Sequence, residues 1–125
     1  MRLIIEGERS IRLIAMADGA ALNVESAQPG LDFSPLHMLA ASLATCTLSV
    51  IAAWAMQAGL SMDGLEIELD WNYVDDPYRV GEYDMRIRWP QLPADRRAAA
   101  LRVAEHCTVE HTLRIPPEIR TTIVA

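Results

Sequence analysis

A 24-residue segment, from Pro35 to Ala58, limits most strongly what this chain can fold into. Its only ionisable side chains are His37 and Cys46, and most other positions are apolar or small. Ser34 is a natural N-cap, the proline after it suits the first helical position, and Gly59 is a typical C-terminal stop. The segment therefore predicts one long helix without the charged stripe of an ordinary surface helix.

Such a helix needs apolar surroundings on nearly every side, which either a membrane or protein can supply. Its length would allow a membrane span. However, the acids Asp32 and Asp63 flank it, no arginine lies close to either end, and strand-like segments precede and follow it. We therefore expect no membrane partner. Because 125 residues offer few other elements to cover the helix, we expect a homodimer with two such helices at its centre.

The remaining segments predict strands and a second helix. Strand patterns occupy residues 2–6, 11–16 and 21–25, joined by the connection 7–10 and by a tight turn at Asp18-Gly19. The clearest alternation covers residues 65–73 and 83–89, which we expect to form a hairpin. In that hairpin Glu66 and Glu68 would lie opposite Arg86 and Arg88 on a solvated sheet face.

A second helix is expected from Ala94 to about Thr112, and a final strand at residues 119–124. The order of strands, helix, hairpin, helix and strand predicts an α+β fold, and residues 1–125 are expected to form a single domain.

Composition and charge exclude several classes of protein. Hydrophobic residues make up 51% of the chain, so it is globular, and two cysteines are too few for a disulfide scaffold. The net charge of −6 argues against a nucleic-acid partner. Glu6 interrupts the N-terminal apolar run too early for a signal peptide, so we expect a cytoplasmic protein with reduced thiols.

Taken separately, each cysteine has an ordinary explanation. Burial on an apolar helix would make Cys46 an unreactive core thiol, and a reactive Cys46 would need a cation from elsewhere in the fold. Cys107 and His111 share a helix face at the i, i+4 spacing, which suggests a metal site completed by His106 or His37. Because the chain has neither a CxxC nor an HExxH motif, we predict no metal site.

Taken together, the two cysteine segments resemble the family of osmotically inducible protein C and the organic hydroperoxide resistance proteins, the OsmC/Ohr family. The first segment, residues 34–47, has a Ser-Pro start leading into a small-residue helix that carries Cys46. The second, residues 104–113, carries Cys107 and looks like the family's second cysteine motif. The hairpin between the two segments matches the family's element order, so the resemblance covers essentially the whole chain.

This resemblance implies two intertwined chains around paired central helices, and it implies thiol peroxidase chemistry. Cys46 would be the peroxidatic cysteine and Cys107 the resolving one. The implied partners are a second copy of the chain, a small hydroperoxide and an external dithiol reductant, without a cofactor. In the family an arginine of the N-terminal hairpin stabilises the thiolate; Arg9 is the better match here and Arg12 the alternative. Both arginines would otherwise be exposed strand charges.

The chain departs from the family pattern at the start of the central helix. Peroxidase members carry a glutamate directly after the proline, where this chain has Leu36. Leu36 cannot bind a guanidinium group, whereas neutral His37 can accept a hydrogen bond from one; both are expected on the substrate side of the site, with Arg12. Three alternatives follow: an acid from elsewhere substitutes, the protein is a redox or sulfur-handling protein without efficient peroxidase activity, or it is a non-catalytic dimeric binding protein.

Overall fold

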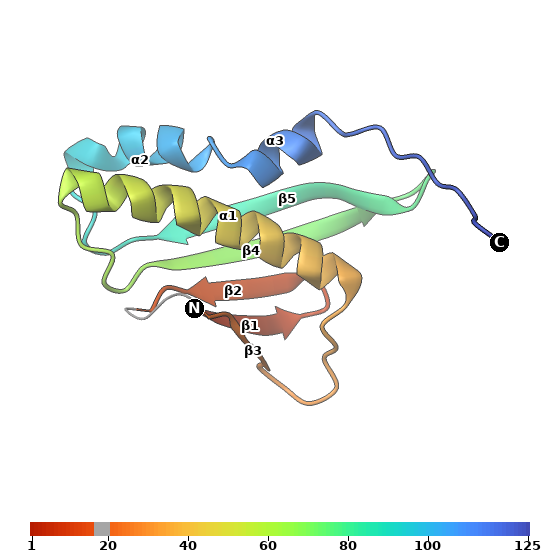
Figure 1. Cartoon of the computed structure of the whole chain (residues 1–125). Coiled ribbons are helices and arrows are strands. Elements are labelled where there is room, and N and C mark those ends of the chain that lie inside the picture. The colour runs from red at the N-terminus through yellow and green to blue at the C-terminus, as the bar shows by residue number, and fades with distance from the viewer. Residues whose placement is uncertain (17–20) are drawn as a thin grey trace.

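A five-stranded sheet with one long helix across it dominates the computed structural model, which describes residues 1–16 and 21–125. The strand order is β3-β1-β2-β4-β5, with β3 parallel to β1 and the other neighbours antiparallel. Helix α1 lies on one face of the sheet, and α2 and α3 lie beside α1 near β5 (Figure 1). The elements are β1 Arg2–Gly7, β2 Ser10–Ile14, β3 Asn23–Ser26, α1 Pro35–Ala58, β4 Glu66–Val74, β5 Arg79–Arg88, the 3-10 helix η1 Ala94–Arg96, α2 Arg97–Ala104 and α3 Thr108–Arg114.

Helix α1 begins and ends where the sequence predicts. Ser34 is its N-cap, a proline occupies the first helical position, and Gly59 ends it in the left-handed conformation with φ 66°. The helix is long and apolar enough to cross a membrane by length and composition. In the folded chain, however, one of its faces packs on the sheet and contributes to a core with Leu13, Ile67 and Leu69. It is therefore the core helix of an α+β domain.

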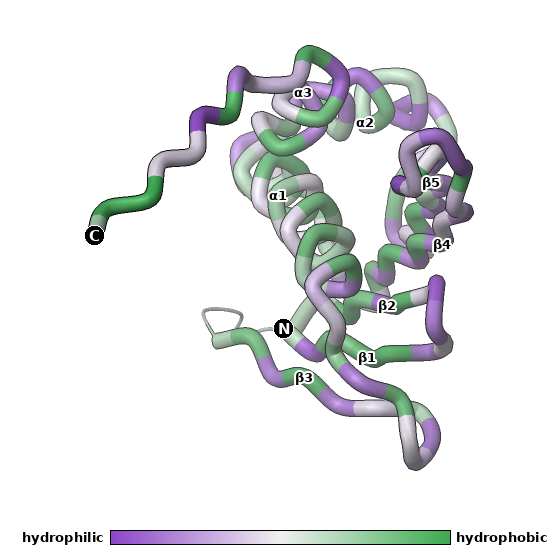
Figure 2. The backbone as a smooth tube through the Cα atoms, turned by 90° about the vertical axis from the view of Figure 1, so that its right-hand side faces the viewer, coloured by the Kyte–Doolittle hydropathy of each residue, from purple (hydrophilic) through white to green (hydrophobic). Residues whose placement is uncertain are grey.

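The predicted hairpin of β4 and β5 is confirmed, including its register. Glu66 lies opposite Arg88, and Glu68 lies opposite Arg86. Arg88 Nη2 lies 2.8 Å from Glu68 Oε1, and Arg86 Nη2 lies 2.7 Å from Asp70 Oδ2. These ion pairs are exposed and contribute little to stability, so this face of the sheet is solvated, as the alternation indicates. Figure 2 shows the alternation of hydropathy along both strands.

Several predicted boundaries were wrong. The β1–β2 turn consists of Glu8 and Arg9 alone, so the connection is shorter than the four residues expected. The third strand, β3, begins at Asn23 rather than at residue 21. The predicted Asp18-Gly19 turn lies outside the described residues.

The predicted second helix is broken into α2 and α3. The break falls at residues 105–107, where Cys107 has an extended backbone with φ −77° and ψ 126°. The helix ends there because Cys107 becomes the N-cap of a new helix instead of continuing the first one.

The predicted final strand is not formed within the chain. Residues 115–125 have no helix or strand and are exposed throughout; Ile119 and Ile123 are 83% and 92% exposed. The segment extends away from the domain (Figure 1), so its backbone has no neighbouring strand with which to pair.

Candidate functional site

The two cysteines, 61 positions apart in the sequence, adjoin in the fold, and we call them the thiol pair. Cys46 lies in the middle of α1 and is half-buried, and Cys107, at the start of α3, is fully buried. Both are free thiols, and their side chains are joined by a hydrogen bond. The Cys107 Sγ atom also lies 4.0 Å from the carbonyl oxygen of Leu43, one turn before Cys46. The fold therefore brings together the two cysteines that the resemblance paired.

The first turn of α3 is bound by the sulfur atoms of the thiol pair. The backbone N–H of Glu110 donates to Cys107 Sγ at 3.4 Å. The N–H groups of Thr108 and Val109 donate to the sulfur of Cys46. These are three of the four N–H groups that a helix leaves without an internal partner at its start. Because the helix is broken before α3, the N–H groups of the first turn of α3 point at the two sulfur atoms.

This geometry lowers the pKa of the Cys46 thiol. Burial alone would raise this pKa, because it disfavours the charged thiolate. The thiol of Cys107 and the N–H groups of Val109 and Thr108 all donate hydrogen bonds to the thiolate and together outweigh the effect of burial. Sequence reasoning expected a cation for this task and missed the backbone donors. The Cys-x-x-Glu spacing at residues 107–110, which resembles a capping box, is the signal that could have indicated a helix start there.

The pKa of the Cys107 thiol is shifted in the opposite direction. Burial raises it, and so does the hydrogen bond to Cys46, which requires that Cys107 keep its proton. The hydrogen bond from the Glu110 N–H and the contact with the Thr47 side chain act in the other direction but are weaker. The pair is therefore asymmetric, because the pKa of Cys46 is lowered and that of Cys107 is raised. Such a pair can attack an electrophilic oxygen and then form a disulfide.

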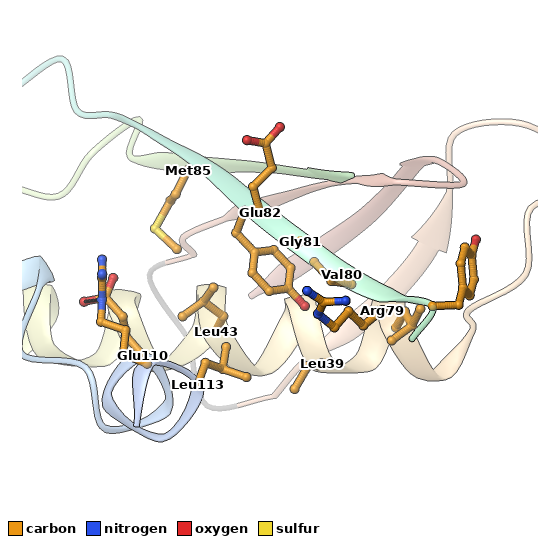
Figure 3. A pocket seen from close by; sticks show the side chains of 13 residues that line it. Leu39, Leu43, Arg79, Val80, Gly81, Glu82, Met85, Glu110 and Leu113 are labelled. Atoms are coloured by element: carbon orange, nitrogen blue, oxygen red, sulfur yellow. Dashed lines mark ion pairs between the residues drawn. The ribbon is translucent and has the colours of Figure 1, made fainter. Parts of the chain in front are cut away.

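A groove of about 710 Å³ lies beside the thiol pair, between α1, the start of β5 and α3. It shares Leu43 and Glu110 with the surroundings of Cys107. Figure 3 shows Leu43 of α1 between the helix and β5, with Leu113 of α3 just below it and Glu82 pointing away from the helix. Its walls are mainly apolar, and the charged members lie on β5 and α3; the lining residues are Leu36, Leu39, Leu43, Tyr78, Arg79, Val80, Gly81, Glu82, Tyr83, Met85, Glu110, Leu113 and Arg114.

Leu36 and His37 occupy different environments at the start of α1. Leu36 lines the groove. His37 is only 4% exposed, and both of its ring nitrogens are bonded within the chain, to Ser34 and to the Gly7 carbonyl. The expected substrate contact of His37 is therefore not formed, because the ring has no free nitrogen to offer.

The two arginines of the N-terminal hairpin, Arg9 and Arg12, also lie in different environments. Arg9 is exposed in the β1–β2 turn, and its carbonyl accepts a hydrogen bond from the Trp71 N–H at 3.1 Å. Arg12 lies on the solvated face of the sheet, where its guanidinium is 2.8 Å from Glu6 and 3.4 Å from Glu66. Its neighbours Ile11 and Leu13 point into the core, so Arg12 points away from α1. Its position fits the alternative of an exposed strand charge.

The helical spacing of Cys107 and His111, which suggested a metal site, is interrupted at the start of α3. Cys107 precedes α3 as its N-cap, so it does not share a regular helical face with His111. The rings of His106 and His111 have centroids 6.5 Å apart. Within residues 1–16 and 21–125, no group of three or more His, Cys, Asp or Glu side chains is arranged to hold a metal ion.

Comparison with known proteins agrees with this architecture. A crystal structure from Psychrobacter arcticus 273-4, provisionally described as an osmotic stress induced and detoxification response protein, superposes with a TM-score of 0.62 at 24% identity, covering 88% of this chain and 84% of that one. An OsmC-like hydroperoxide resistance protein from Jannaschia sp. CCS1 superposes with a TM-score of 0.57 at 24% identity, covering 74% and 67%. No curated protein matches the sequence. The family model described as OsmC-like protein matches residues 28–122, which include both cysteines, and the chain therefore belongs to the OsmC family.

Proposed function

We propose that this protein reduces organic hydroperoxides, with Cys46 as the peroxidatic and Cys107 as the resolving cysteine. The observation that carries the proposal is the asymmetric thiol pair, in which the pKa of Cys46 is lowered and its neighbour Cys107 keeps a proton. Membership of the OsmC family and the likeness to a protein named for hydroperoxide resistance support this role. We place the reaction in the cytoplasm, where an external dithiol can regenerate the thiols.

The proposed reaction runs in three balanced steps. The Cys46 thiolate attacks the distal oxygen of ROOH, which gives a sulfenic acid on Cys46 and an alkoxide that leaves as ROH after protonation. The Cys107 thiol then condenses with the sulfenic acid, forming the disulfide and releasing water. A dithiol finally reduces the disulfide by thiol–disulfide exchange and becomes a disulfide itself. The organic group of the substrate would lie in the groove, against Leu36 and Leu43.

Arg9 is the proposed cation for the developing negative charge on the leaving oxygen. It is exposed and not tied to an acid in the described ion pairs, whereas Arg12 is held by Glu6 and Glu66. Arg9 would reach the thiol pair from the β1–β2 turn of a second copy of the chain.

We also propose that the protein is a homodimer. Helix α1 leaves a stripe of uncharged residues exposed on the face away from the sheet, formed by Met38, Ser42, Ser49, Ala53 and Met56. Small side chains on such a stripe allow two helices to approach closely. The exposed segment 115–125 carries four large apolar side chains, at Ile115, Ile119, Ile123 and Val124, that a second chain would cover. Sedimentation equilibrium at micromolar concentration is expected to give a dimer; a folded monomer of 13.9 kDa would contradict this.

The experiment that tests the function is hydroperoxide consumption in the presence of a dithiol. Cumene hydroperoxide and hydrogen peroxide should be compared for wild type, Cys46→Ser, Cys107→Ser and Arg9→Ala. We expect Cys46→Ser and Arg9→Ala both to consume hydroperoxide far more slowly than wild type, Arg9→Ala with a residual rate that stopped flow can measure, and Cys107→Ser to react once and then stop turning over. A wild type as slow as Cys46→Ser would exclude the peroxidase function.

A second candidate is a thiol redox protein without efficient peroxidase activity. The observation that favours it is Leu36, which lines the groove where peroxidase members of the family carry an acid. Leu36→Glu is expected to speed cumene hydroperoxide reduction if the missing acid limits the rate. Rapid exchange of the Cys46–Cys107 disulfide with dithiols, together with slow peroxide reaction in both proteins, would favour the second candidate.

A further inference from the structure

His37 closes the N-terminus of α1 in an unusual way. The Ser34 hydroxyl accepts a hydrogen bond from the His37 N–H at 3.2 Å, and the Nδ1 atom of His37 lies 3.3 Å from the Ser34 N–H and 2.6 Å from the Ser34 hydroxyl. This is the arrangement of a capping box in which histidine takes the place of glutamate or glutamine. The cap uses only one side of the imidazole ring.

The other side of the ring binds the N-terminal hairpin. The Nε2 atom lies 2.8 Å from the carbonyl oxygen of Gly7, thirty positions earlier in the chain. Because a carbonyl oxygen only accepts, Nε2 carries the proton, and Nδ1 of the neutral ring is the acceptor for Ser34. The ring is also packed edge-on against Trp71, with centroids 5.2 Å apart. Helix capping does not require this second bond.

The bond to Gly7 fixes one end of the turn that carries Arg9. Gly7 is the last residue of β1, and a two-residue turn, Glu8 and Arg9, joins it to β2. At the other end of the turn, the Arg9 carbonyl accepts a hydrogen bond from the Trp71 N–H at 3.1 Å. The turn is thus held on both sides, by His37 and by the backbone of β4.

We propose that His37 is a positioning residue for Arg9, acting through the carbonyl of Gly7. The inference rests on the proposed function, in which Arg9 serves the thiol pair. His37 fixes the backbone from which Arg9 extends, in a chain that has Leu36 in place of an acid able to hold the guanidinium directly. A small displacement of a group that acts on the reacting atoms can lower a rate by up to about 100-fold. Fixing the backbone next to Arg9 through the His37–Gly7 hydrogen bond, which we call the tether, would therefore affect the rate as an acid bound directly to the guanidinium would.

Two substitutions of His37 distinguish the tether, its hydrogen bond to the Gly7 carbonyl, from the cap that it forms with Ser34. In His37→Gln the longer side chain keeps an N–H able to reach the Gly7 carbonyl. In His37→Asn the shorter side chain keeps an acceptor near the Ser34 N–H but does not reach Gly7. We expect His37→Asn to lower kcat/KM for cumene hydroperoxide about tenfold, mainly through kcat, and His37→Gln to remain within about threefold of wild type. The exposed His106→Asn is the matched control and should match wild type.

A double-mutant cycle with Arg9→Ala decides whether the effect passes through Arg9. If His37 positions Arg9, His37→Asn has no further effect in the Arg9→Ala background. The proposal is overturned if His37→Asn is equally harmful with and without Arg9, or if His37→Gln is the impaired variant and His37→Asn is not. Hydrogen exchange distinguishes this from failure of the proposed function. Even in a protein that consumes no hydroperoxide, His37→Asn should speed exchange of the amides of residues 8–11, and unchanged exchange there would contradict the tether.

Discussion

The starts of α1 and α3 are both capped by side chains, but with different atoms. At α1 the cap consists of the Ser34 hydroxyl and the His37 ring, which packs on Trp71 and is bonded to Gly7. At α3 the acceptors are the two sulfurs of the thiol pair. The first cap has the same chemistry whether the protein is reduced or oxidised. The second changes when Cys46 and Cys107 react.

Because of this difference, the two helices depend on different contacts for their stability. Helix α1 has 24 residues, is anchored at both ends by caps and packs on the sheet. Helix α3 has seven residues, is exposed beyond its first turn and leads into the extended segment 115–125. Because short isolated helices are marginally stable in water, α3 depends on its first turn and hence on the state of the thiol pair.

The largest expected effect is on amide exchange in α3 after oxidation. A disulfide carries no charge and its sulfurs are weak acceptors, so the N–H groups of Thr108 and Val109 lose the charged acceptor that the Cys46 thiolate provides. Each such loss costs about 1 kcal/mol, and the two together correspond to exchange faster by about 30-fold. Hydrogen-exchange mass spectrometry of reduced and oxidised protein should show this for α3 and not for the start of α1. Equal protection of α3 in both states would remove the distinction between the helices.

Next in size is the change in Cys46 reactivity when its neighbour is removed. Since the pKa of Cys46 is lowered, its alkylation rate should reach half-maximum below the ordinary thiol pKa of about 8.5 and fall as the pH drops through the lowered pKa. Cys107→Ala removes one donor to the thiolate and should move the midpoint upward, whereas Cys107→Ser retains a donor and should move it less. The rate of iodoacetamide modification between pH 5 and 10 gives both midpoints. An unmoved midpoint in Cys107→Ala would mean that Cys107 does not stabilise the thiolate.

A smaller effect is expected at the other cap. Ser34→Ala should lower the free energy of unfolding by about 1 kcal/mol, as is typical of a lost N-cap. Because Ser34 lies three turns before Cys46, the alkylation midpoint of Cys46 should not change. Urea denaturation and iodoacetamide titration of the same variant provide the two measurements, and a shifted midpoint would show that the two helix starts are coupled.

The smallest expected effect concerns the ion pair between Glu110 and Arg114 on α3, whose atoms are 3.6 Å apart. The Arg114 side chain is 70% exposed, so Arg114→Gln should change the free energy of unfolding by no more than about 0.5 kcal/mol. If this variant instead destabilised the protein by about 2 kcal/mol, the exposed ion pair would stabilise α3 more than the hydrogen bonds to the sulfur atoms at its first turn.

The sequence was most informative where local chemistry and periodicity agree. Capping residues and the uncharged run from Pro35 to Ala58 correctly bounded α1, and strict alternation correctly paired Glu66 with Arg88. The pairing of Cys46 with Cys107 followed from resemblance, because a separation of 61 positions in the sequence leaves the distance between two cysteines undetermined. The break before Cys107 was missed because residues 94–112 contain no glycine or proline that would mark the end of a helix, and the interruption depends on tertiary contacts with Cys46.

His37 illustrates a second limit. Its position two residues after Pro35 suggested a role facing the substrate, but its partners are Ser34 in the same turn and Gly7 at the end of a distant strand. Which ring nitrogen binds which partner depends on how α1 lies across β1, and no local pattern reports that. Likewise, the final strand was predicted from composition alone, whereas a strand also requires an edge with which to pair.

Counting thiols after stoichiometric oxidation tests whether Cys46 and Cys107 form a redox pair within one chain. Reduced protein should be mixed with one equivalent of cumene hydroperoxide per chain, alkylated, and examined by thiol titration and by peptide mass spectrometry without reduction. We expect free thiols to fall from two per chain to none, with a peptide joining Cys46 to Cys107 of the same chain. Two remaining free thiols, or a disulfide between different chains, would contradict it.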